Sequence, residues 1–170
     1  ISNSGGVILS TNGGGSWIPL TDNLPTQACG ALAVDPGNPN VVYYGTGDIL
    51  RGSYGMAGIF KSTDAGQSWS VSAPLSQVGA SVVRIVVDPA NSQRIFAATI
   101  YYLLRSVDGG STWSKVFDET NAGGNSSGAI WDVVIHSSNP NIIILSVSYQ
   151  SSDAGIYKST DGGTTWYKVT

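Results

Sequence analysis

The side chains that most often build disulfides and metal sites are almost missing from this chain of 170 residues. It contains a single cysteine, Cys29, and a single histidine, His136. One cysteine cannot form a disulfide within the chain or a cysteine-based zinc site. One histidine cannot form a multi-histidine metal site. We therefore expect the protein to use no metal and no cofactor.

Charged side chains are also scarce, at 11% of the sequence, and the net charge is −3. Proteins that bind nucleic acid need many cations to neutralise phosphates, so nucleic acid is not an expected partner. No apolar run reaches the roughly 18 residues that a membrane span requires. The first residues carry neither a starting methionine nor a targeting signal, so we expect a mature protein or a piece of one.

A short motif, S-x-[DN]-x-G-x-[ST]-W, occurs four times in the sequence. Successive tryptophans of the motif are 52, 44 and 53 residues apart. Short β-branched or aromatic runs flank the copies and glycines lie inside them, which predicts a hairpin with a tight turn. The defining residues of the four copies are Ser10, Asn12, Gly14 and Trp17; Ser62, Asp64, Gly66 and Trp69; Ser106, Asp108, Gly110 and Trp113; and Ser159, Asp161, Gly163 and Trp166.

A second motif alternates with the first and consists of two β-branched runs around a turn rich in proline and asparagine. Its turns span 35–40, 88–93 and 136–141, so that His136 stands where the other copies have aspartate. Each copy predicts another hairpin. One repeat of about 45–50 residues then holds four strands, which is the period of a β-propeller blade. No segment has a clear 3.6-residue apolar period, and we predict an all-β protein of four-stranded antiparallel blades.

The first motif resembles the Asp-box, or BNR repeat, of sialidases, sortilin-type receptors, xyloglucanases and many secreted bacterial propellers. The resemblance covers nearly the whole chain, with strands named A to D from the channel outward and the box forming the C–D hairpin. Asn12 departs from it, since an aspartate is expected there. We expect the box aspartate to accept hydrogen bonds from its own turn, the glycine to adopt a positive φ, and the tryptophan to pack between blades. We interpret all four boxes as structural.

The number of hairpins predicts about three and a half blades. Residues 1–20 form a C–D half blade, and residues 30–73, 82–117 and 130–170 form one blade each. A closed propeller typically has four to eight blades. We therefore predict a segment of a ring of six to eight blades, completed by the remaining blades of the same ring or by other copies of the chain.

Candidate functional residues lie in the loops at the top rim, where the B–C and D–A connections vary in length. The long B–C connection of the first complete blade contains Asp48, Arg51 and Tyr54. Xyloglucanase-like propellers carry a catalytic aspartate after a comparable strand, so the resemblance implies a catalytic role for Asp48. The other interpretation is that Asp48 orders its own loop. A glycosidase needs a second carboxyl group about 5–10 Å away; the candidates are Asp118, Glu119 and Asp153, or a residue elsewhere in the protein.

Arg84 and Asp132 occupy the same repeat position at the channel end of adjacent A strands. They predict either an ion pair at the channel mouth or polar contacts with a ligand bound there. Trp131 and Tyr149 are candidates to stack on a sugar, or else pack between blades. The arginine triad and the Tyr/Glu pair of sialidases have no match in this sequence, which argues against sialidase activity.

These features predict a secreted or cell-surface protein of bacterial type. The leading prediction is a non-catalytic β-propeller scaffold that binds a glycan or a partner protein through its top-rim loops. The first alternative is a part of a xyloglucanase-like glycoside hydrolase that acts on β-glucans, with Asp48 as one catalytic carboxylate. The second alternative is a structural module of an extracellular assembly.

Overall fold

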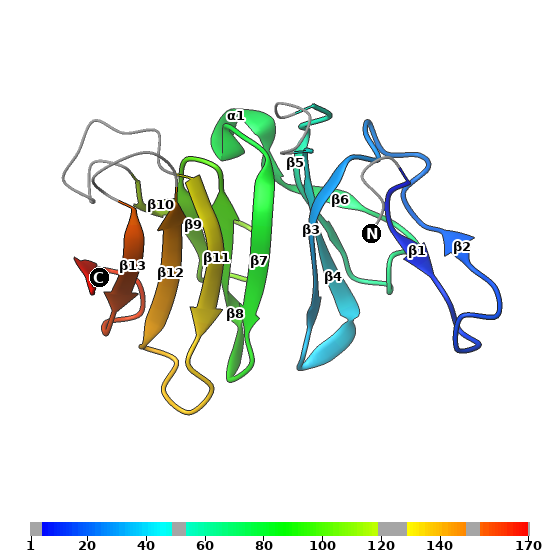
Figure 1. The fold of residues 1–170 in the computed structure, drawn as a ribbon. Helices are drawn as coiled ribbons and strands as arrows, with labels where there is room; N and C mark the ends of the chain where they lie inside the picture. The colour runs from blue at the N-terminus through cyan, green and yellow to red at the C-terminus, as the bar shows by residue number, and fades with distance from the viewer. Residues whose placement is uncertain (1–4, 49–53, 119–128, 149–153, 170) are drawn as a thin grey trace.

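Three four-stranded antiparallel sheets and one two-stranded hairpin make up the molecule (Figure 1). The computed structural model describes residues 5–48, 54–118, 129–148 and 154–169. The hairpin consists of β1 (Ile8–Leu9) and β2 (Ile18–Pro19). The sheets consist of β3 (Cys29–Asp35), β4 (Asn38–Thr46), β5 (Gly58–Ser62) and β6 (Ser70–Pro74); β7 (Val82–Asp88), β8 (Asn91–Thr99), β9 (Leu103–Ser106) and β10 (Ser114–Phe117); and β11 (Ala129–Ile135), β12 (Ile143–Ser148), β13 (Gly155–Ser159) and β14 (Tyr167–Lys168).

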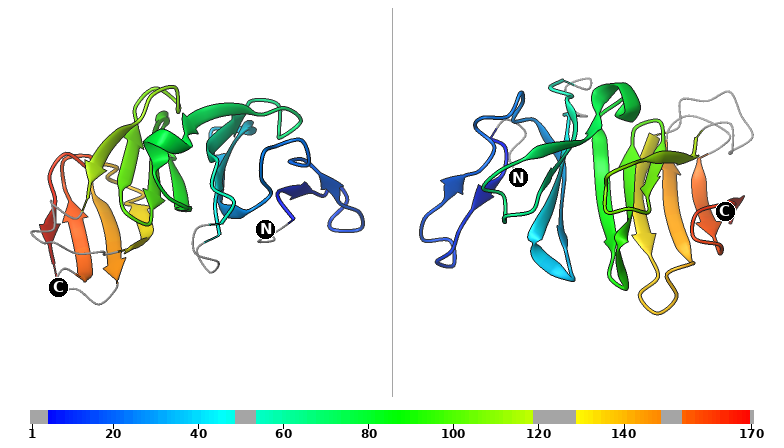
Figure 2. Two further views of the ribbon diagram at one scale, coloured as in Figure 1. Left: turned by 90° about the horizontal axis from the view of Figure 1, so that it is seen from above. Right: turned by 180° about the vertical axis from the view of Figure 1, so that it is seen from behind.

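Each sheet is a meander in which consecutive strands are neighbours. Seen from above, the hairpin and the three sheets follow one another in chain order along an arc (Figure 2). The inner strand β7 contacts both β3 and β11, the inner strands of the sheets on either side. The molecule is therefore an all-β, partial β-propeller of about three and a half blades, which confirms the predicted fold class.

A short helix, α1 (Leu75–Val78), was not expected from the sequence. It connects β6 to β7 at the upper edge of the molecule and ends at Gly79, whose φ of 72° is the left-handed conformation typical of a helix C-terminus. The turns that join β3 to β4 and β7 to β8 lie at the opposite edge (Figure 1). Helix α1 thus lies at the edge opposite these turns, which we call the top rim.

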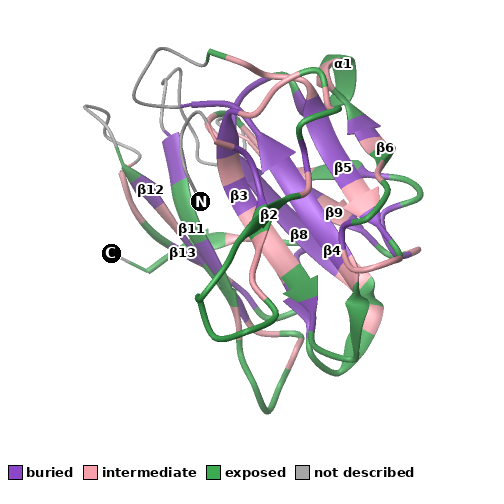
Figure 3. Ribbon diagram, turned by 90° about the vertical axis from the view of Figure 1, so that its right-hand side faces the viewer, coloured by how far each residue is buried: buried purple, intermediate pink, exposed green. Residues whose placement is uncertain are grey.

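The burial of the second strand in each sheet shows which sheets are covered on both faces. Residues Val42–Thr46 of β4 and Ile95–Thr99 of β8 are buried without a break. In β12 buried and exposed positions alternate, as in a sheet with one open face. Figure 3 shows the same contrast between the continuous buried stretches of β4 and β8 and the exposed positions of β12.

The turns at the lower edge are fixed by side chains that accept hydrogen bonds from the turn itself. Asp35 accepts one from the Gly37 amide at 2.8 Å and another from the Ser92 hydroxyl of the next sheet at 2.6 Å. At the equivalent position in the third sheet, Nδ1 of His136 accepts hydrogen bonds from the amides of Ser138 and Asn139. The single histidine of the chain therefore takes part in a turn.

Each Asp-box is held by a small network around the side chain at its third position, which is aspartate in three boxes and Asn12 in the first. In the second box, Oδ1 of Asp64 accepts hydrogen bonds from the Ser62 hydroxyl at 2.7 Å and from the Ser68 amide at 2.8 Å. The Ser68 hydroxyl donates to Oδ2 at 2.5 Å, and the Gly66 amide, at a φ of 91°, donates to the Ser62 hydroxyl at 2.8 Å. The third and fourth boxes repeat this network, and in the first box Oδ1 of Asn12 accepts from the equivalent amide at 2.9 Å.

These hydrogen bonds favour the ionised carboxylate. The neighbouring Ser68 hydroxyl is the largest cause that lowers the pKa of Asp64 from 3.8 to about 2, followed by the Ser68 amide. The Thr112 hydroxyl does the same for Asp108, whose pKa is also lowered to about 2. Asp161, bonded to the Thr165 hydroxyl, is shifted in the same direction.

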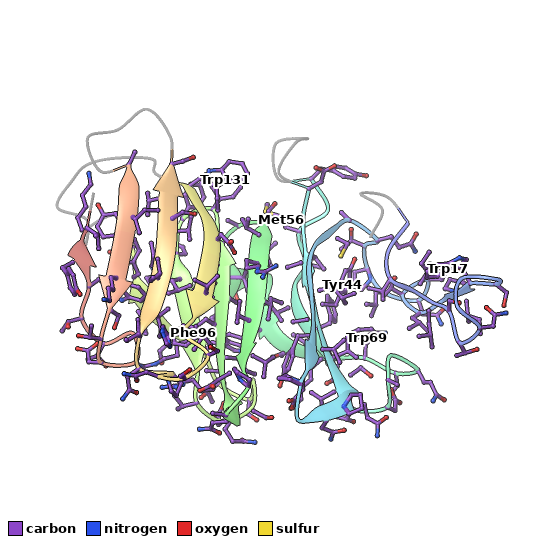
Figure 4. The ribbon with its side chains drawn as sticks, turned by 60° about the horizontal axis from the view of Figure 1, so that its bottom comes forward. Trp17, Tyr44, Met56, Trp69, Phe96 and Trp131 are labelled. Atoms are coloured by element: carbon purple, nitrogen blue, oxygen red, sulfur yellow. The ribbon has the colours of Figure 1, made fainter. Side chains whose placement is uncertain are left out.

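The box tryptophans join each sheet to the one before it. The indole N–H of Trp69 donates to the Leu20 carbonyl at 2.9 Å, and that of Trp113 donates to the Ser72 hydroxyl at 3.1 Å. Trp166 donates to the Val116 carbonyl at 3.0 Å. In every case the acceptor residue follows the preceding box tryptophan by three positions. Trp17 of the first box has no sheet before it in the described ranges and is 57% exposed (Figure 4).

Replacing a box tryptophan tests how much of its contribution to stability comes from its contact with the preceding sheet. We expect Trp113→Ala, at a position only 6% exposed, to lower the free energy of unfolding by about 3–5 kcal/mol, as large buried aromatic residues do. Trp17→Ala removes the same side chain from the same motif and should cost less than about 1 kcal/mol. Urea unfolding followed by circular dichroism measures both. Equal losses would contradict the role assigned to the contact between sheets.

The box carboxylates should make the free energy of unfolding depend on pH in the acidic range. Because the pKa values of Asp64 and Asp108 fall from 3.8 to about 2 on folding, the folded state favours the ionised form. Their contribution is fully present above pH 3.8 and is lost as the pH falls through about 2. We expect the urea midpoint to decrease over this interval, and Asp108→Asn to show a smaller decrease. Unchanged pH dependence in that variant would refute the assignment.

Candidate functional site

Asp48 lies just beyond the upper end of β4, at the base of the long B–C connection. It forms an isolated β-bridge with Tyr54, in which the Asp48 amide donates to the Tyr54 carbonyl at 2.9 Å. The bridge brings the two ends of the connection together. Asp48 is only 4% exposed whereas Tyr54 is 70% exposed, so a shielded carboxyl group lies beside an open aromatic ring. Arg51, predicted between them, falls outside the described residues.

A threonine hydroxyl closes the base of this connection. The Thr46 hydroxyl accepts hydrogen bonds from the amides of Ala57 and Gly58 at 2.8 and 2.9 Å and donates to the Gly58 carbonyl at 2.8 Å. These bonds fix the start of β5 against the end of β4. Asp48 therefore begins its loop from a rigid position.

Gly47 places Asp48 against the neighbouring sheet. Its φ of 113° lies in the region that glycine tolerates. A Cβ atom at this position would lie 2.4 Å from Oγ of Ser81 and 2.7 Å from its Cα, and Ser81 directly precedes β7. Asp48 is thus positioned at the junction of two blades, which the sequence did not indicate.

The three inner strands each contain a β-bulge at the same register position. The bulged residues are Gly30 in β3, Val83 in β7 and Trp131 in β11. A bulge turns side chains away from the regular pleat, and Trp131 is 43% exposed at the upper end of β11 (Figure 4). Val83 and Trp131 line the same small depression, so two neighbouring bulges contribute to one surface.

Arg84 and Asp132 directly follow the second and third bulges. Nε of Arg84 lies 3.3 Å from Oδ1 of Asp132, and the two side chains are 53% and 56% exposed. An ion pair so open to water contributes about 0–1 kcal/mol to stability. The pair joins adjacent inner strands and leaves both groups accessible, next to the exposed ring of Trp131.

The remaining predicted site residues are not brought together by the described structure. Tyr149, Glu119 and Asp153 fall outside the described residues. Asp118 follows β10, the outer strand of the second sheet. Asp48 follows β4, the second strand from the inside of the first sheet. The two carboxyl groups therefore come from different sheets and from strands at different distances from the channel. The bulges were missed by sequence reasoning, because a bulge depends on the register between two strands.

Two absences hold for the parts of the chain that the structure describes. No group of three or more histidine, cysteine, aspartate or glutamate side chains there could hold a metal ion. The same residues contain no helix long and apolar enough to cross a membrane.

Comparison with known proteins identifies the family. The family model described as "Sortilin-Vps10: Sortilin, neurotensin receptor 3" matches residues 57–170. The chain belongs to this family of Asp-box propellers. The match agrees with the resemblance to Asp-box propellers found in the sequence.

Curated relatives of this Sortilin-Vps10 family member are named xyloglucanases. One from Acetivibrio thermocellus is 31% identical over 91% of this chain and 22% of its own length. Another, from the fungus Hypocrea jecorina, is 34% identical over 96% of this chain and 23% of its own length. The crystal structure of an ancestral GH74 enzyme matches with a TM-score of 0.76 and 31% identity, over 99% of this chain and 22% of that one. The chain thus spans about a fifth of the length of the relatives it matches.

These relatives correct the leading functional prediction. The chain was predicted to be a non-catalytic scaffold, but its relatives are named as enzymes and the similar solved structure is that of a GH74 enzyme. The prediction of a scaffold is wrong, and the findings favour the alternative of a glycoside hydrolase. The error arose because the Asp-box residues that dominate the sequence carry structural information only.

The position of Asp48 should depend on the glycine before it. We expect Gly47→Ala to lower the free energy of unfolding by about 1–3 kcal/mol through backbone strain, with a further loss from the clash with Ser81. Gly13→Ala is the matched control, because Gly13 has a φ of 69° but nothing within 4 Å of an added Cβ. Urea unfolding of both variants measures the difference. A Gly47→Ala variant no less stable than Gly13→Ala would show that the junction is not tightly packed.

Proposed function

We propose that this chain is part of a glycoside hydrolase that cleaves xyloglucan, with Asp48 as one catalytic carboxylate. The observation that carries the proposal is the shielded Asp48 carboxyl, held at the top rim of a chain whose relatives at 31% and 34% identity are named xyloglucanases. The top rim is the side on which the sequence predicts the variable B–C and D–A connections, and loops on a rigid scaffold usually carry catalysis.

Asp48 suits proton transfer to or from the glycosidic oxygen or an attacking water. Its carboxyl group is largely screened from bulk water, while the bridge to Tyr54 and the packing of Gly47 hold its backbone. Hydrolysis needs a second carboxyl group on the other side of the scissile bond. Asp118, Glu119 and Asp153 stay candidates for it, as does a residue in another part of the protein.

The exposed residues at the ends of the inner strands and in the B–C connection suit a neutral polysaccharide. The open rings of Trp131 and Tyr54 offer flat apolar surfaces for sugar rings, and Arg84 and Asp132 offer donors and acceptors for hydroxyl groups. Arg51 and Tyr149 stay predicted contributors. Because xyloglucan is a polymer too large to enter cells, we propose that the protein acts after secretion.

The predicted division into blades and the ring of six to eight blades belong to the same proposal. The relatives are about five times longer than this chain, which leaves ample length for further blades. A ring would also supply surfaces for the second carboxyl group and for more of the substrate.

Asp48→Asn tests the catalytic assignment directly. We expect the hydrolase of which this chain is proposed to be part to release reducing ends from xyloglucan. The variant should lose at least about 100-fold in kcat, since a general acid or base typically contributes that much. Asp22→Asn, an exposed carboxylate elsewhere on the chain, is the control and should keep the wild-type rate. Retained activity in Asp48→Asn would overturn the role of Asp48.

Trp131→Ala tests the proposed contact with sugar in the same assay. We expect a higher KM with kcat little changed, because the ring binds substrate without taking part in the reaction. Affinity electrophoresis in gels containing xyloglucan measures binding independently of turnover. If that hydrolase neither bound nor hydrolysed xyloglucan, the proposed substrate would be refuted.

A further inference from the structure

Asn12 differs chemically from the residues at the same position of the other boxes. It carries an amide where Asp64, Asp108 and Asp161 carry carboxylates, and it is followed by Gly13. This is the only Asn-Gly pair in the sequence. In such a pair the glycine nitrogen can attack the side-chain amide, because glycine has no side chain to obstruct the approach. Both residues are exposed, so water and hydroxide reach them.

The side chain of Asn12 lies in a network that polarises its amide group. Oδ1 accepts hydrogen bonds from the Ser16 amide at 2.9 Å and from the Ser10 hydroxyl at 3.1 Å. Because a backbone N–H can only donate, the side-chain atom that it meets must be the oxygen. The two donors draw electrons away from Cγ and stabilise the negative charge that Oδ1 carries when a nucleophile adds, as in an oxyanion hole.

The nitrogen of the same amide contacts a hydroxyl group. Nδ2 of Asn12 donates to Oγ of Ser16 at 2.9 Å. Once a nucleophile has added to Cγ, this nitrogen has a lone pair that can accept the hydroxyl proton, and it then leaves as ammonia. Ser16 therefore lies where a general acid is needed. Gly15 leaves space beside the amide, since a Cβ atom there would lie only 3.2 Å from Nδ2 and 3.3 Å from Cγ.

The nucleophile is the backbone nitrogen of Gly13. In the other three boxes the equivalent amide donates to the carbonyl of the last residue of an A–B turn. These pairs are Ala65 with Asn40 at 2.8 Å, Gly109 with Gln93 at 3.0 Å and Gly162 with Asn141 at 3.0 Å. The Gly13 amide has no such acceptor within residues 5–48, 54–118, 129–148 and 154–169. It can attack without first breaking a hydrogen bond.

We propose that Asn12 is a modification site, at which the folded chain converts its own amide into aspartate. Hydroxide removes the Gly13 amide proton, the nitrogen bonds to Cγ, and the bond from Cγ to Nδ2 breaks to release ammonia and leave a cyclic imide. Water then adds at Cγ, the bond from Cγ to the Gly13 nitrogen breaks, and that nitrogen recovers a proton. One water is consumed and one ammonia is released, with no oxidation or reduction. The reaction does not depend on the proposed hydrolysis of xyloglucan.

The network favours aspartate over isoaspartate, the isomer whose backbone runs through the side chain. Water that adds at Cγ gives aspartate, whereas water that adds at the main-chain carbonyl of Asn12 gives isoaspartate. The Ser16 amide and the Ser10 hydroxyl polarise the first of these carbonyls. Isoaspartate would also lengthen the backbone between Ser10 and Gly14, whose hydroxyl and amide are joined by a hydrogen bond of 2.7 Å.

Aspartate at this position would complete a fourth acidic box. In the second and third boxes the hydroxyl of the seventh residue donates to the carboxylate, from Ser68 to Asp64 at 2.5 Å and from Thr112 to Asp108 at 2.6 Å. The Ser16 hydroxyl accepts from the amide instead, and would turn to donate after the conversion. The first box would then gain the stability above acidic pH that a hydrogen-bonded carboxylate provides.

Incubation of the folded full chain in mildly alkaline buffer tests the conversion. It lasts until the Asn12 peptide of a urea-unfolded sample is fully converted, as followed by mass spectrometry of peptides, with Asn12→Asp as the reference. We expect most of the folded chain to convert, with aspartate as its main product and isoaspartate as that of the unfolded chain. A folded chain that keeps Asn12 unchanged, or that yields mainly isoaspartate, would overturn the proposal.

A second Asn-Gly pair in the same chain measures the effect of the unbonded nucleophile. Asp64→Asn combined with Ala65→Gly introduces this pair in the second box, where the amide of residue 65 donates to the Asn40 carbonyl. Glycine fits there because Ala65 has a φ of 60°. We expect this pair to convert at least about tenfold more slowly than Asn12 in the folded chain, as protection by a hydrogen bond requires, and equally fast after unfolding. Equal rates in the folded chain would refute the role of the Gly13 amide.

Ser16→Ala tests the network around Asn12 itself. Without the hydroxyl, we expect conversion in the folded chain to be at least about tenfold slower, because the proton donor for the leaving ammonia is gone. The unfolded variant should convert at the wild-type rate, since the hydroxyl has no fixed position there. A folded variant that converts as fast as the wild type would refute the assignment of Ser16 as the acid.

Discussion

The contact between an Asp-box and the sheet before it is the constraint on which the rest of the molecule depends. A single blade has two apolar faces and cannot bury them alone, so its stability comes from its neighbours. The box meets the preceding sheet through an indole N–H, a glycine and a carbonyl group, as Trp113, Gly110 and Gly109 show. Because the same few contacts recur at each covered face, the angle between sheets is repeated and the sheets follow an arc.

This constraint divides the molecule into a fixed edge and a variable edge. The lower edge is occupied by turns that tie to the next sheet, such as Asp35 to Ser92, and Arg94 to both Asp88 and the Pro140 carbonyl. The buried Asp88 is neutralised by Arg94, which makes the turn costly to disrupt. At the upper edge, the Thr46 and Thr99 hydroxyls fix the start of the third strand in the first two sheets, while the connections between the second and third strands differ in length. Length and composition can therefore change there without loss of the fold.

The sequence predicted the features whose physical cause is local. The box hydrogen bonds join residues two to four positions apart, such as Ser62, Asp64 and Ser68, so the motif alone shows them. The ion pair of Arg84 with Asp132 could be anticipated only as one of two possibilities, because it depends on the distance between separate strands. The bulge at Trp131 and the packing of Gly47 on Ser81 involve register and neighbouring sheets, which no short motif records. Function was predicted least well, because a catalytic pair of carboxyl groups is likewise a matter of distance between strands.

The structure also explains how a blade can gain a long B–C loop without losing its sheet. In the first sheet, the Thr46 hydroxyl caps a long B–C connection by bonding the amides of Ala57 and Gly58. In the second, the Thr99 hydroxyl bonds the amides of Tyr101 and Tyr102 and closes a connection of only a few residues. The same side chain at the same register thus fixes the start of the third strand whatever lies between. Since the cost of a longer loop grows slowly with its length, the loop that begins at Asp48 can vary freely while β4 and β5 stay paired. The repeat supplies a rigid frame, and a residue placed two positions after the threonine, as Asp48 is, is held in position by it.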